Sequence, residues 1–359
     1  MSHHGQLNRI SELALRCYAG STGMSKRATT ARDIAARVGV SQASVSYAFS
    51  SKPDKRSLIS EETRKRILAV AEEIGYFPNR TAQSIRTGKT DLIALWVPNF
   101  TNSIYLRTMR GIQDVAGQHG LDILVYGGTS AKGMEGVLRS FGERRVDGAI
   151  LIARPLEEAA LHVLKQLELP LVTIGGSQTY PGVDSVLTRN AAAFEEMVLH
   201  LAARGYTRIG HISGPLTTPT AQERLEGYQC GLKSAKLPFK KIWQREGTYR
   251  AGSAGHLALE LARLPAPPDA LVLANDLMAI EAILALRDAG IRVPHDIAIV
   301  GCDDTPEGEV VRPRLTTIRR PGMRAAQAAM KLLLERMQGF QGNARTVWLE
   351  AELVIRESA

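Results

Sequence analysis

Apolar residues near the start of the chain recur at intervals of three and four, which is the spacing of one buried helix face. Thr30, with Asp33 three residues later, predicts an N-terminal capping box. The apolar stripe that follows consists of Ile34, Ala35 and Val38. Gly39 stops the pattern, so the sequence predicts a short helix between Thr30 and Gly39.

A second helix is predicted directly after this one, with Ser41 as its N-cap. Its buried face comprises Val45, Ala48 and Phe49. Its outer face comprises Gln42, Ala43, Ser44, Ser46 and Tyr47. Ser60 caps a third helix that ends at Gly75, and the three helices together predict a helix-turn-helix unit.

The segment after Pro78 has the composition of a linker with one short helix. Asn79 is a candidate N-cap for residues 80–86, and Thr87-Gly88-Lys89-Thr90 ends the pattern. A helix of this length is not stable alone. We therefore expect a hinge whose helix forms only when something supports it.

From Asp91 onward the pattern changes to short apolar runs separated by helical stretches. The runs cover Leu92 to Val97, Leu121 to Tyr126, Ala149 to Ala153, Leu171 to Ile174, Ile209 to Ser213, Ala270 to Ala274 and Ile297 to Gly301. Strands that alternate with helices predict parallel sheets covered on both faces. The length favours two α/β lobes over one, with ligands bound where loops leave the carboxyl ends of strands.

Composition indicates a protein of the cytoplasm. The chain has 359 residues and is 44% apolar, yet no apolar run approaches the roughly 18 residues of a membrane helix. The first 23 residues lack the order of a secretory signal. Cys17, Cys230 and Cys302 are far apart, so we expect neither a disulfide framework nor a metal site, and no cofactor.

Positive charge is concentrated in one short segment. Residues 24–90 carry 13 Lys and Arg against 6 Asp and Glu, whereas residues 91–359 carry 30 against 29. Neutralisation of phosphates provides most of the sequence-independent affinity for nucleic acid. This distribution is typical of a DNA-binding module, although charge alone is equally compatible with a solvated basic face.

Six motifs in order along the chain resemble the lactose repressor (LacI) family. The first is Thr29-Thr30-Ala31-Arg32-Asp33-Ile34-Ala35-Ala36-Arg37-Val38-Gly39-Val40-Ser41 with Ser44-Val45-Ser46. The others are Gly75-Tyr76-Phe77-Pro78-Asn79 with Ala82, Arg224-Leu225-Glu226-Gly227-Tyr228, Asn275-Asp276 with Met278-Ala279, Val300-Gly301 with Asp303-Asp304, and Pro313 with Leu315-Thr316-Thr317-Ile318. Any one motif alone would be weak evidence, but their ordered spread is specific.

The resemblance implies an all-α helix-turn-helix head and an α/β two-lobed core similar to periplasmic binding proteins. On this basis we expect a flexible tail at 1–23, a DNA-binding domain at 24–77, a hinge helix and linker at 78–90 and an effector-binding and dimerisation core at 91–359. Members of the family act as dimers on near-palindromic double-stranded operators. No sustained heptad follows Trp348, so we expect a homodimer without a C-terminal tetramer zipper.

The resemblance also assigns candidate DNA contacts, which are Thr30, Ser41, Gln42, Ala43, Ser44, Ser46, Tyr47, Asn79, Ala82 and Ile85. Gln42 suits adenine, and Ala43 offers a methyl contact to thymine. Tyr47 stands where the family commonly has an arginine for guanine, so it either reads a base or covers the neighbouring helix. Ile85 takes the place of the leucine that wedges a base step open, or packs against the partner's hinge helix.

The effector-binding positions implied by the family are Tyr105, Arg154, Arg224, Tyr249, Asn275, Asp303 and Arg320. Their donors and acceptors suit a small, hydroxyl-rich, carbohydrate-like ligand. Arg154 and Arg320 add two cations, which indicate an acidic or phosphorylated effector or, alternatively, structural ion pairs. We expect Asp304 to cap a helix or remain in solvent.

Three alternatives to an effector-controlled regulator differ in how well they fit the sequence. The chain has no phosphate loop, nucleophile elbow or His-Glu-x-x-His pair, so we do not expect an enzyme. A plain solute-binding protein would explain two lobes but not the basic head. A core switched by a protein partner in place of a small molecule fits the sequence equally well.

Overall fold

The computed structural model describes residues 29–49, 53–76, 84, 88–98, 100, 102–128, 133–143, 146–152, 156–176 and 178–359. The chain forms two compact units, Met1–Gln83 and Ser84–Ala359, each described here by itself. The predicted tail at 1–23, and the hinge apart from Ser84 and residues 88–90, lie outside the described residues. The domain bounds given above therefore stay predictions.

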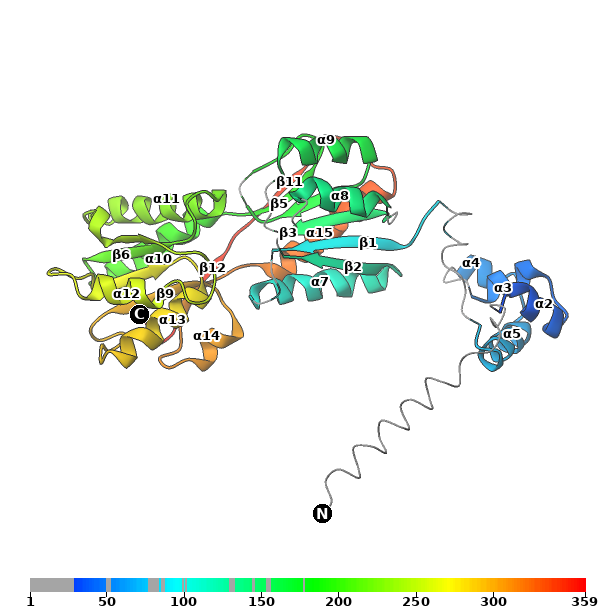
Figure 1. Cartoon of the computed structure of the whole chain (residues 1–359), viewed down its shortest axis with the longest axis horizontal. Coiled ribbons are helices and arrows are strands. Elements are labelled where there is room, and N and C mark those ends of the chain that lie inside the picture. The colour runs from blue at the N-terminus through cyan, green and yellow to red at the C-terminus, as the bar shows by residue number, and fades with distance from the viewer. Residues whose placement is uncertain are drawn as a thin grey trace, which may run out of the picture. The chain divides into compact units, whose positions relative to one another are not determined.

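The first unit contains a small bundle of short helices, labelled in Figure 1. They are α2 (Ala31–Val38), α3 (Gln42–Ala48), α4 (Pro53–Arg56) and α5 (Glu61–Glu73). The predicted capping box is present, because the backbone N–H of Thr30 donates to Asp33 Oδ2 at 2.8 Å. Gly39 has φ 75°, a left-handed conformation that a glycine adopts at low cost at a helix end. The one-turn helix α4 was not predicted, since a single turn is too short to show a periodic pattern.

Two side chains of α5 hold the C-terminal ends of α2 and α3. Arg66 Nη2 donates to the carbonyl of Val38 at 3.0 Å, and Arg64 Nε donates to the carbonyl of Ala48 at 3.4 Å. These carbonyls belong to the C-terminal turns of α2 and α3, where cations are favourable. The enclosed core consists of Ile34, Ala35, Val38, Val45, Ala48, Ile67 and Ala71.

The second unit contains two lobes, each built on a six-stranded sheet. The N lobe comprises β1 (Leu92–Val97), α7 (Ile104–Gln118), β2 (Asp122–Gly127), α8 (Gly133–Glu143), β3 (Gly148–Ile152), α9 (Glu158–Leu167), β4 (Leu171–Ile174), β5 (Asp184–Thr188), α15 (Gly322–Met337) and β11 (Thr346–Leu349). Its strand order is β11-β5-β4-β3-β1-β2, with every pair parallel. This all-parallel arrangement requires cover on both faces of the sheet.

The C lobe comprises α10 (Asn190–Ala203), β6 (Ile209–Ser213), α11 (Pro219–Ser234), η1 (Lys241–Trp243), β7 (Gln244–Glu246), α12 (Gly255–Ala262), β8 (Ala270–Leu273), α13 (Asp276–Asp288), β9 (Ala298–Asp303), α14 (Pro306–Val310), β10 (Thr316–Arg319) and β12 (Glu352–Val354). Its strand order is β12-β10-β9-β8-β6-β7. Only the pair β10 and β12 is antiparallel among the described strands of this sheet.

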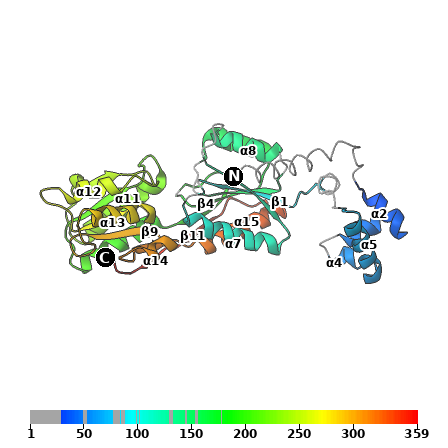
Figure 2. The ribbon, with the colours of Figure 1, turned by 60° about the horizontal axis from the view of Figure 1, so that its bottom comes forward.

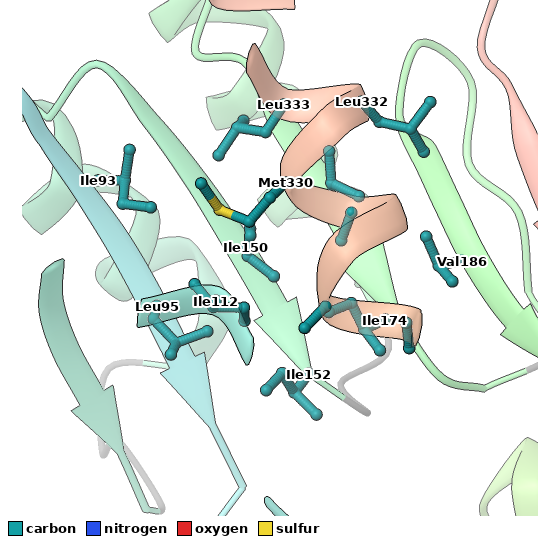
Figure 3. Packing of buried hydrophobic residues seen from close by; sticks show 14 of the residues in the cluster. Ile93, Leu95, Ile112, Ile150, Ile152, Ile174, Val186, Met330, Leu332 and Leu333 are labelled. Carbon is teal, nitrogen blue, oxygen red and sulfur yellow. The ribbon is translucent and has the colours of Figure 1, made fainter. Parts of the chain in front are cut away.

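Helices cover both faces of the N-lobe sheet, as Figure 2 shows for α7 and α8. Successive residues of β1 point to opposite faces, because Leu95 joins the cluster under α7 and α15 while Trp96 joins the cluster under α8 and α9. Figure 3 shows Met330 and Leu333 of α15 over Ile93 and Ile150 of the sheet. The expectation of doubly covered parallel sheets is confirmed.

The chain passes between the lobes three times, after β5, after β10 and after β11. Each of the apolar runs predicted as strands lies on a strand whose bounds differ by at most two residues. The strands β5, β7, β10, β11 and β12 were not predicted. No helix in the ranges that the structure describes is long and apolar enough to cross a bilayer.

Candidate functional site

The outer face of α3 carries the small and polar side chains predicted to contact DNA. Ser41 is the N-cap, and its Oγ accepts from the backbone N–H of Ser44 at 3.0 Å. Exposed positions on this face are Gln42, Ala43 and Ser46, while Ser44 and Tyr47 are half-buried. Because Val45 and Ala48 are buried in the bundle, the other side chains of the helix point away from it.

The remaining candidate DNA contacts are divided by what the structure describes. Thr30 is exposed, with its hydroxyl 2.8 Å from Asp33 Oδ2. Three predicted contacts, Asn79, Ala82 and Ile85, lie outside the described residues. The roles of all ten positions therefore stay predictions.

The candidate effector residues come together where strands of the C lobe end and the N lobe approaches. Arg320 Nη1 lies 3.8 Å from Asp303 Oδ1, and the guanidinium of Arg224 lies 5.8 Å from the centre of the Tyr249 ring. Asn275 Nδ2 donates to the carbonyl of Tyr249 at 3.2 Å. These five residues place a carboxylate, two guanidinium groups, an amide and an aromatic ring in one cluster.

Tyr105 of the N lobe belongs to the same cluster. Burial, followed by the negative charge of Asp303, raises the pKa of Tyr105 to about 12. A phenol that stays protonated at all physiological pH values retains a hydrogen-bond donor. Arg154, the seventh predicted effector residue, lies outside the described residues.

Arg224 is held by aromatic rings and a carbonyl. It is only 3% exposed, its guanidinium lies 5.5 Å from the centre of the Phe194 ring, and its Nη1 donates to the carbonyl of Ala274. Burial by itself lowers the pKa of Arg224, but the neighbouring Tyr249 and Asp303 contribute to a net rise. The side chain is therefore a fixed cation with Nε buried and without a hydrogen-bond partner.

Asn275 has a structural role that sequence analysis did not assign. Its Oδ1 accepts from the backbone N–H of Met278 at 3.0 Å, so Asn275 is the N-cap of α13. The amide oxygen is thus engaged, and Nδ2 is the group directed to the Tyr249 loop. Any contact of Asn275 with a ligand would involve a side chain that already orients α13.

Asp303, the last residue of β9, and Asp304 form a strained turn. Their φ angles are 136° and 54°, values that cost about 1–3 kcal/mol each for residues other than glycine. Asp304 is 2% exposed and accepts from Arg356 Nη2 at 2.6 Å and from Arg319 Nε at 2.7 Å. The expectation that Asp304 caps a helix or remains in solvent is wrong, because arginines distant in sequence surround its carboxylate in the folded chain.

Asp276 is a further buried carboxylate next to this turn. It is fully buried, and it accepts from the backbone N–H of Thr305 at 2.7 Å and from the hydroxyl of Thr317 at 2.5 Å. Burial, with Asp303 as the next contribution, raises the pKa of Asp276 to about 7. The motif Asn275-Asp276 was noted in the sequence, but its second residue was not assigned a role.

The raised pKa of Asp276 predicts a pH-dependent loss of stability. Between its ordinary value of 3.8 and about 7, the unfolded chain has released this proton while the folded chain keeps it. The free energy of unfolding should therefore fall as pH rises through this window, by up to about 1.4 kcal/mol per pH unit. Urea unfolding of wild type and Asp276→Asn at several pH values measures the difference. The same slope in both proteins would contradict the assignment.

A helix-turn-helix head followed by a two-lobed α/β core defines a class of DNA-binding regulators whose core has the fold of small-molecule-binding proteins. Two family models match the chain: "Bacterial regulatory proteins, lacI family" over residues 30–79, and "Periplasmic binding protein-like domain" over residues 198–359. The HTH-type transcriptional repressor PurR of Aliivibrio salmonicida (strain LFI1238) is 30% identical over 332 residues, which cover 92% of this chain and 98% of the relative. The chain belongs to the lacI family of bacterial regulatory proteins.

Solved structures agree with this membership. The Lac repressor dimer bound to operator and the anti-inducer ONPF has a TM-score of 0.80 and 27% identity, with 92% of this chain and 99% of that chain covered. A complex of the transcriptional regulator CelR with cellobiose has a TM-score of 0.70 and 27% identity, with 92% and 100% covered. The predicted fold class and family are confirmed, and the protein is a DNA-binding transcription regulator and not an enzyme.

Some residues of the cluster were not found by sequence reasoning. Asn102 lies two residues before α7, Arg107 lies in the first turn of α7, and Phe194 lies on α10. Phe194 belongs to an ordinary apolar stripe, and the two polar residues sit on a segment without a motif. No signal in a single sequence distinguishes them, because their partners are about 200 positions away along the chain.

Proposed function

We propose that this chain is a cytoplasmic homodimeric repressor whose affinity for a near-palindromic operator is controlled by a small molecule bound between the two core lobes. The observation that supports this most directly is the capped helix α3, whose small and polar outer face is free of the bundle core. In a helix-turn-helix protein, the second helix enters the major groove. A dimer presents two such helices to two half-sites.

Base reading is assigned to the exposed residues at the start of α3. Gln42 pairs with adenine N6 and N7, and Ala43 contacts the methyl group of thymine. Tyr47 contributes one hydrogen bond or a packing contact. Thr30, Ser41, Ser44 and Ser46 position the helix on phosphates. In the hinge, Asn79 and Ala82 approach the minor groove and Ile85 wedges a base step.

The effector is proposed to contact both lobes at the cluster of Tyr105, Arg224, Tyr249, Asn275, Asp303 and Arg320, with Arg154 as a further candidate. The aromatic rings suit the flat face of a sugar or base, and the charged groups suit hydroxyl or acidic substituents. Structural neighbours include a regulator in complex with cellobiose. We favour a carbohydrate-like effector with an acidic or phosphorylated group.

Regulation follows as a shift between core conformations. A ligand that contacts both lobes stabilises one arrangement of them, and that arrangement favours or disfavours ordered hinge helices on the operator. If a ligand of the core left operator affinity unchanged, this coupling would be excluded.

The test of the proposed function is selection of genomic DNA fragments by the purified protein at fixed, near-physiological salt, followed by sequencing. Recovery of a shared near-palindrome is the expected result, and the genes beside it would suggest the effector. Retention of fragments without a shared motif would contradict sequence-specific binding. Repeating the selection with a metabolite extract present checks whether a corepressor is required.

Gln42→Ala should weaken binding to the recovered operator while leaving non-specific binding unchanged. Loss of a bidentate pair with adenine costs about 1–3 kcal/mol of discrimination. Gel-shift titrations on the operator and on a shuffled fragment measure the two affinities. Gln113→Ala on α7 is the matched control, because Gln113 is an exposed glutamine on a helix of the second unit. An equal loss on both fragments would exclude base reading by Gln42.

A further inference from the structure

The first turn of α7, in the N lobe, contacts the loop that joins β9 to α14 in the C lobe. Arg107 Nη1 lies 3.4 Å from Asp304 Oδ2, and its Nη2 donates to the backbone carbonyl of the same residue. One guanidinium thus holds both the side chain and the main chain of Asp304. A forked contact of this kind fixes orientation as well as distance.

Two neighbours of Arg107 contact residues on either side of this loop, at the end of β9 and in the first turn of α14. Ser103 Oγ donates to Glu307 Oε2 at 2.7 Å. Asn102 donates a side-chain hydrogen bond to Asp303, which lowers the pKa of that carboxyl against the larger raising effect of burial. Residues 102–107 of the N lobe therefore meet residues 303–307 of the C lobe through four polar contacts. We call these contacts the interlobe latch.

The contacts of the interlobe latch can be broken at low cost. When Arg107 leaves, the buried carboxylate of Asp304 keeps Arg319 and Arg356, so it is not left unpaired. The Arg107 side chain is 37% exposed and reaches solvent readily. Ser103 and Glu307 likewise lie at the surface. A contact whose loss leaves no buried charge unpaired is suited to reversible opening.

The latch also adjoins the candidate effector anchor. Asp303 and Asp304 are consecutive, and both have positive φ. Because few backbone conformations are open to such residues, the orientation of Asp304 restricts that of Asp303. Arg107 holds the carbonyl of Asp304, while Arg320 and Asn102 hold the carboxylate of Asp303. A ligand that takes up the carboxylate of Asp303 would therefore alter the turn on which the latch depends.

We propose that Arg107 is a positioning residue: it joins the two lobes in the arrangement seen here and, through Asp304, sets the orientation of Asp303 toward the effector. The inference rests on the proposed function in that Asp303 is taken as an effector anchor. Arg107 itself need not touch the ligand. Arg107 links the closure of the two lobes to the backbone conformation of the Asp303-Asp304 turn.

The test measures lobe separation directly, without DNA or effector. The full chain carries one spin label at Cys230, which is exposed on α11 of the C lobe, and a second at Lys165→Cys on α9 of the N lobe. Cys17→Ser removes the other site, and the buried Cys302 is retained. Labelled chains are diluted into an excess of unlabelled chains so that pulsed EPR reports distances within one chain.

Arg107→Met should increase the ratio of separated to joined lobes by roughly five- to tenfold, as expected for loss of a partly exposed charged hydrogen bond. Arg107→Lys, which keeps the cation but not the fork, should restore part of the joined population. Arg110→Met is the matched control, an exposed arginine on the same helix, and should match wild type. Ser103→Ala, at an exposed hydroxyl, should produce a smaller shift in the same direction.

Distance distributions of Arg107→Met and Ser103→Ala that superimpose on that of wild type would overturn the latch. An equal shift in Arg110→Met would also overturn it, because the effect would then belong to the helix surface in general. These outcomes are separate from failure of the proposed function, which the DNA selection reports. A latch that opens as expected in a protein that recovers no shared DNA motif would remain a structural finding without a role in operator control.

Discussion

Asp184→Asn is expected to lower the free energy of unfolding by about 3–5 kcal/mol, the range found when one partner of a buried ion pair is removed. Asp184 is fully buried at the start of β5 and accepts from Arg336 Nη2 and Arg345 Nη2, each at 2.8 Å. Burial opposes its charge, but the hydrogen bonds from both arginines lower the pKa of Asp184, so the carboxylate is ionised at neutral pH. Asparagine would leave two guanidinium groups without this counter-charge.

The loss of stability should arise where β11 of the N lobe leads into the C lobe. Asp184 also accepts from the backbone N–H of Arg345 at 2.8 Å, next to β11, the strand from which the chain passes into β12. Arg345 retains Glu335 as a second partner, which places the expected loss toward the lower end of the range. Urea unfolding followed by circular dichroism measures it.

Asp288→Asn is the matched control for this substitution. Asp288 pairs with Arg287 at 3.1 Å, but both side chains are more than 60% exposed. An exposed pair contributes about 0–1 kcal/mol. If both variants lost the same stability, burial of the Asp184 cluster would not be the cause.

Gly227→Ala is expected to destabilise the C lobe by about 1–3 kcal/mol, the usual range for overpacking. A Cβ at this position would lie 2.2 Å from the carbonyl oxygen of Ala191 on α10, and the backbone of α10 cannot rotate away as a side chain can. The two helices would have to separate. Arg224 lies three residues earlier on the same helix, one turn away, so the cluster would be displaced as well.

The comparison for Gly227 is Gly117→Ala, on α7. A Cβ at Gly117 meets nothing within 4 Å, and the residue lies within a helix. Alanine should therefore stabilise the chain by about 0.5–1 kcal/mol through helix propensity. Thermal unfolding of the two variants should shift in opposite directions. A stabilised Gly227→Ala would show that α10 and α11 are not packed as closely as described.

The head was predicted well from its sequence because its determinants are local. Thr30, Ser41 and Ser60 all cap helices, and Gly39 adopts the left-handed conformation expected of a helix end. Each of these signals operates within four residues along the chain. Local patterns also predicted buried strands of the core, because the runs Leu92 to Val97, Leu171 to Ile174 and Ile209 to Ser213 coincide with β1, β4 and β6.

Two of the strands that were missed, β5 and β10, contain polar residues that only the fold buries. More than half of the residues in each of these strands are polar, yet Ser185, Thr316 and Thr317 are fully buried. Thr173 and Ser185 share a hydrogen bond of 2.9 Å across neighbouring strands, and the backbone N–H of Thr316 donates to Ser358 at 2.8 Å. Such partners satisfy the polar groups only after the sheet has formed.

The sequence by itself determined the helix-turn-helix, the α/β alternation and, through resemblance, the family and most positions of the cluster. These depend on short-range patterns and on motifs that keep their order along the chain. The tertiary structure alone decided the roles of Asp304, Asp276 and Arg107. Their charges acquire partners 15 to 197 positions away, and burial, which raises the pKa of Asp276, exists only once the lobes are folded.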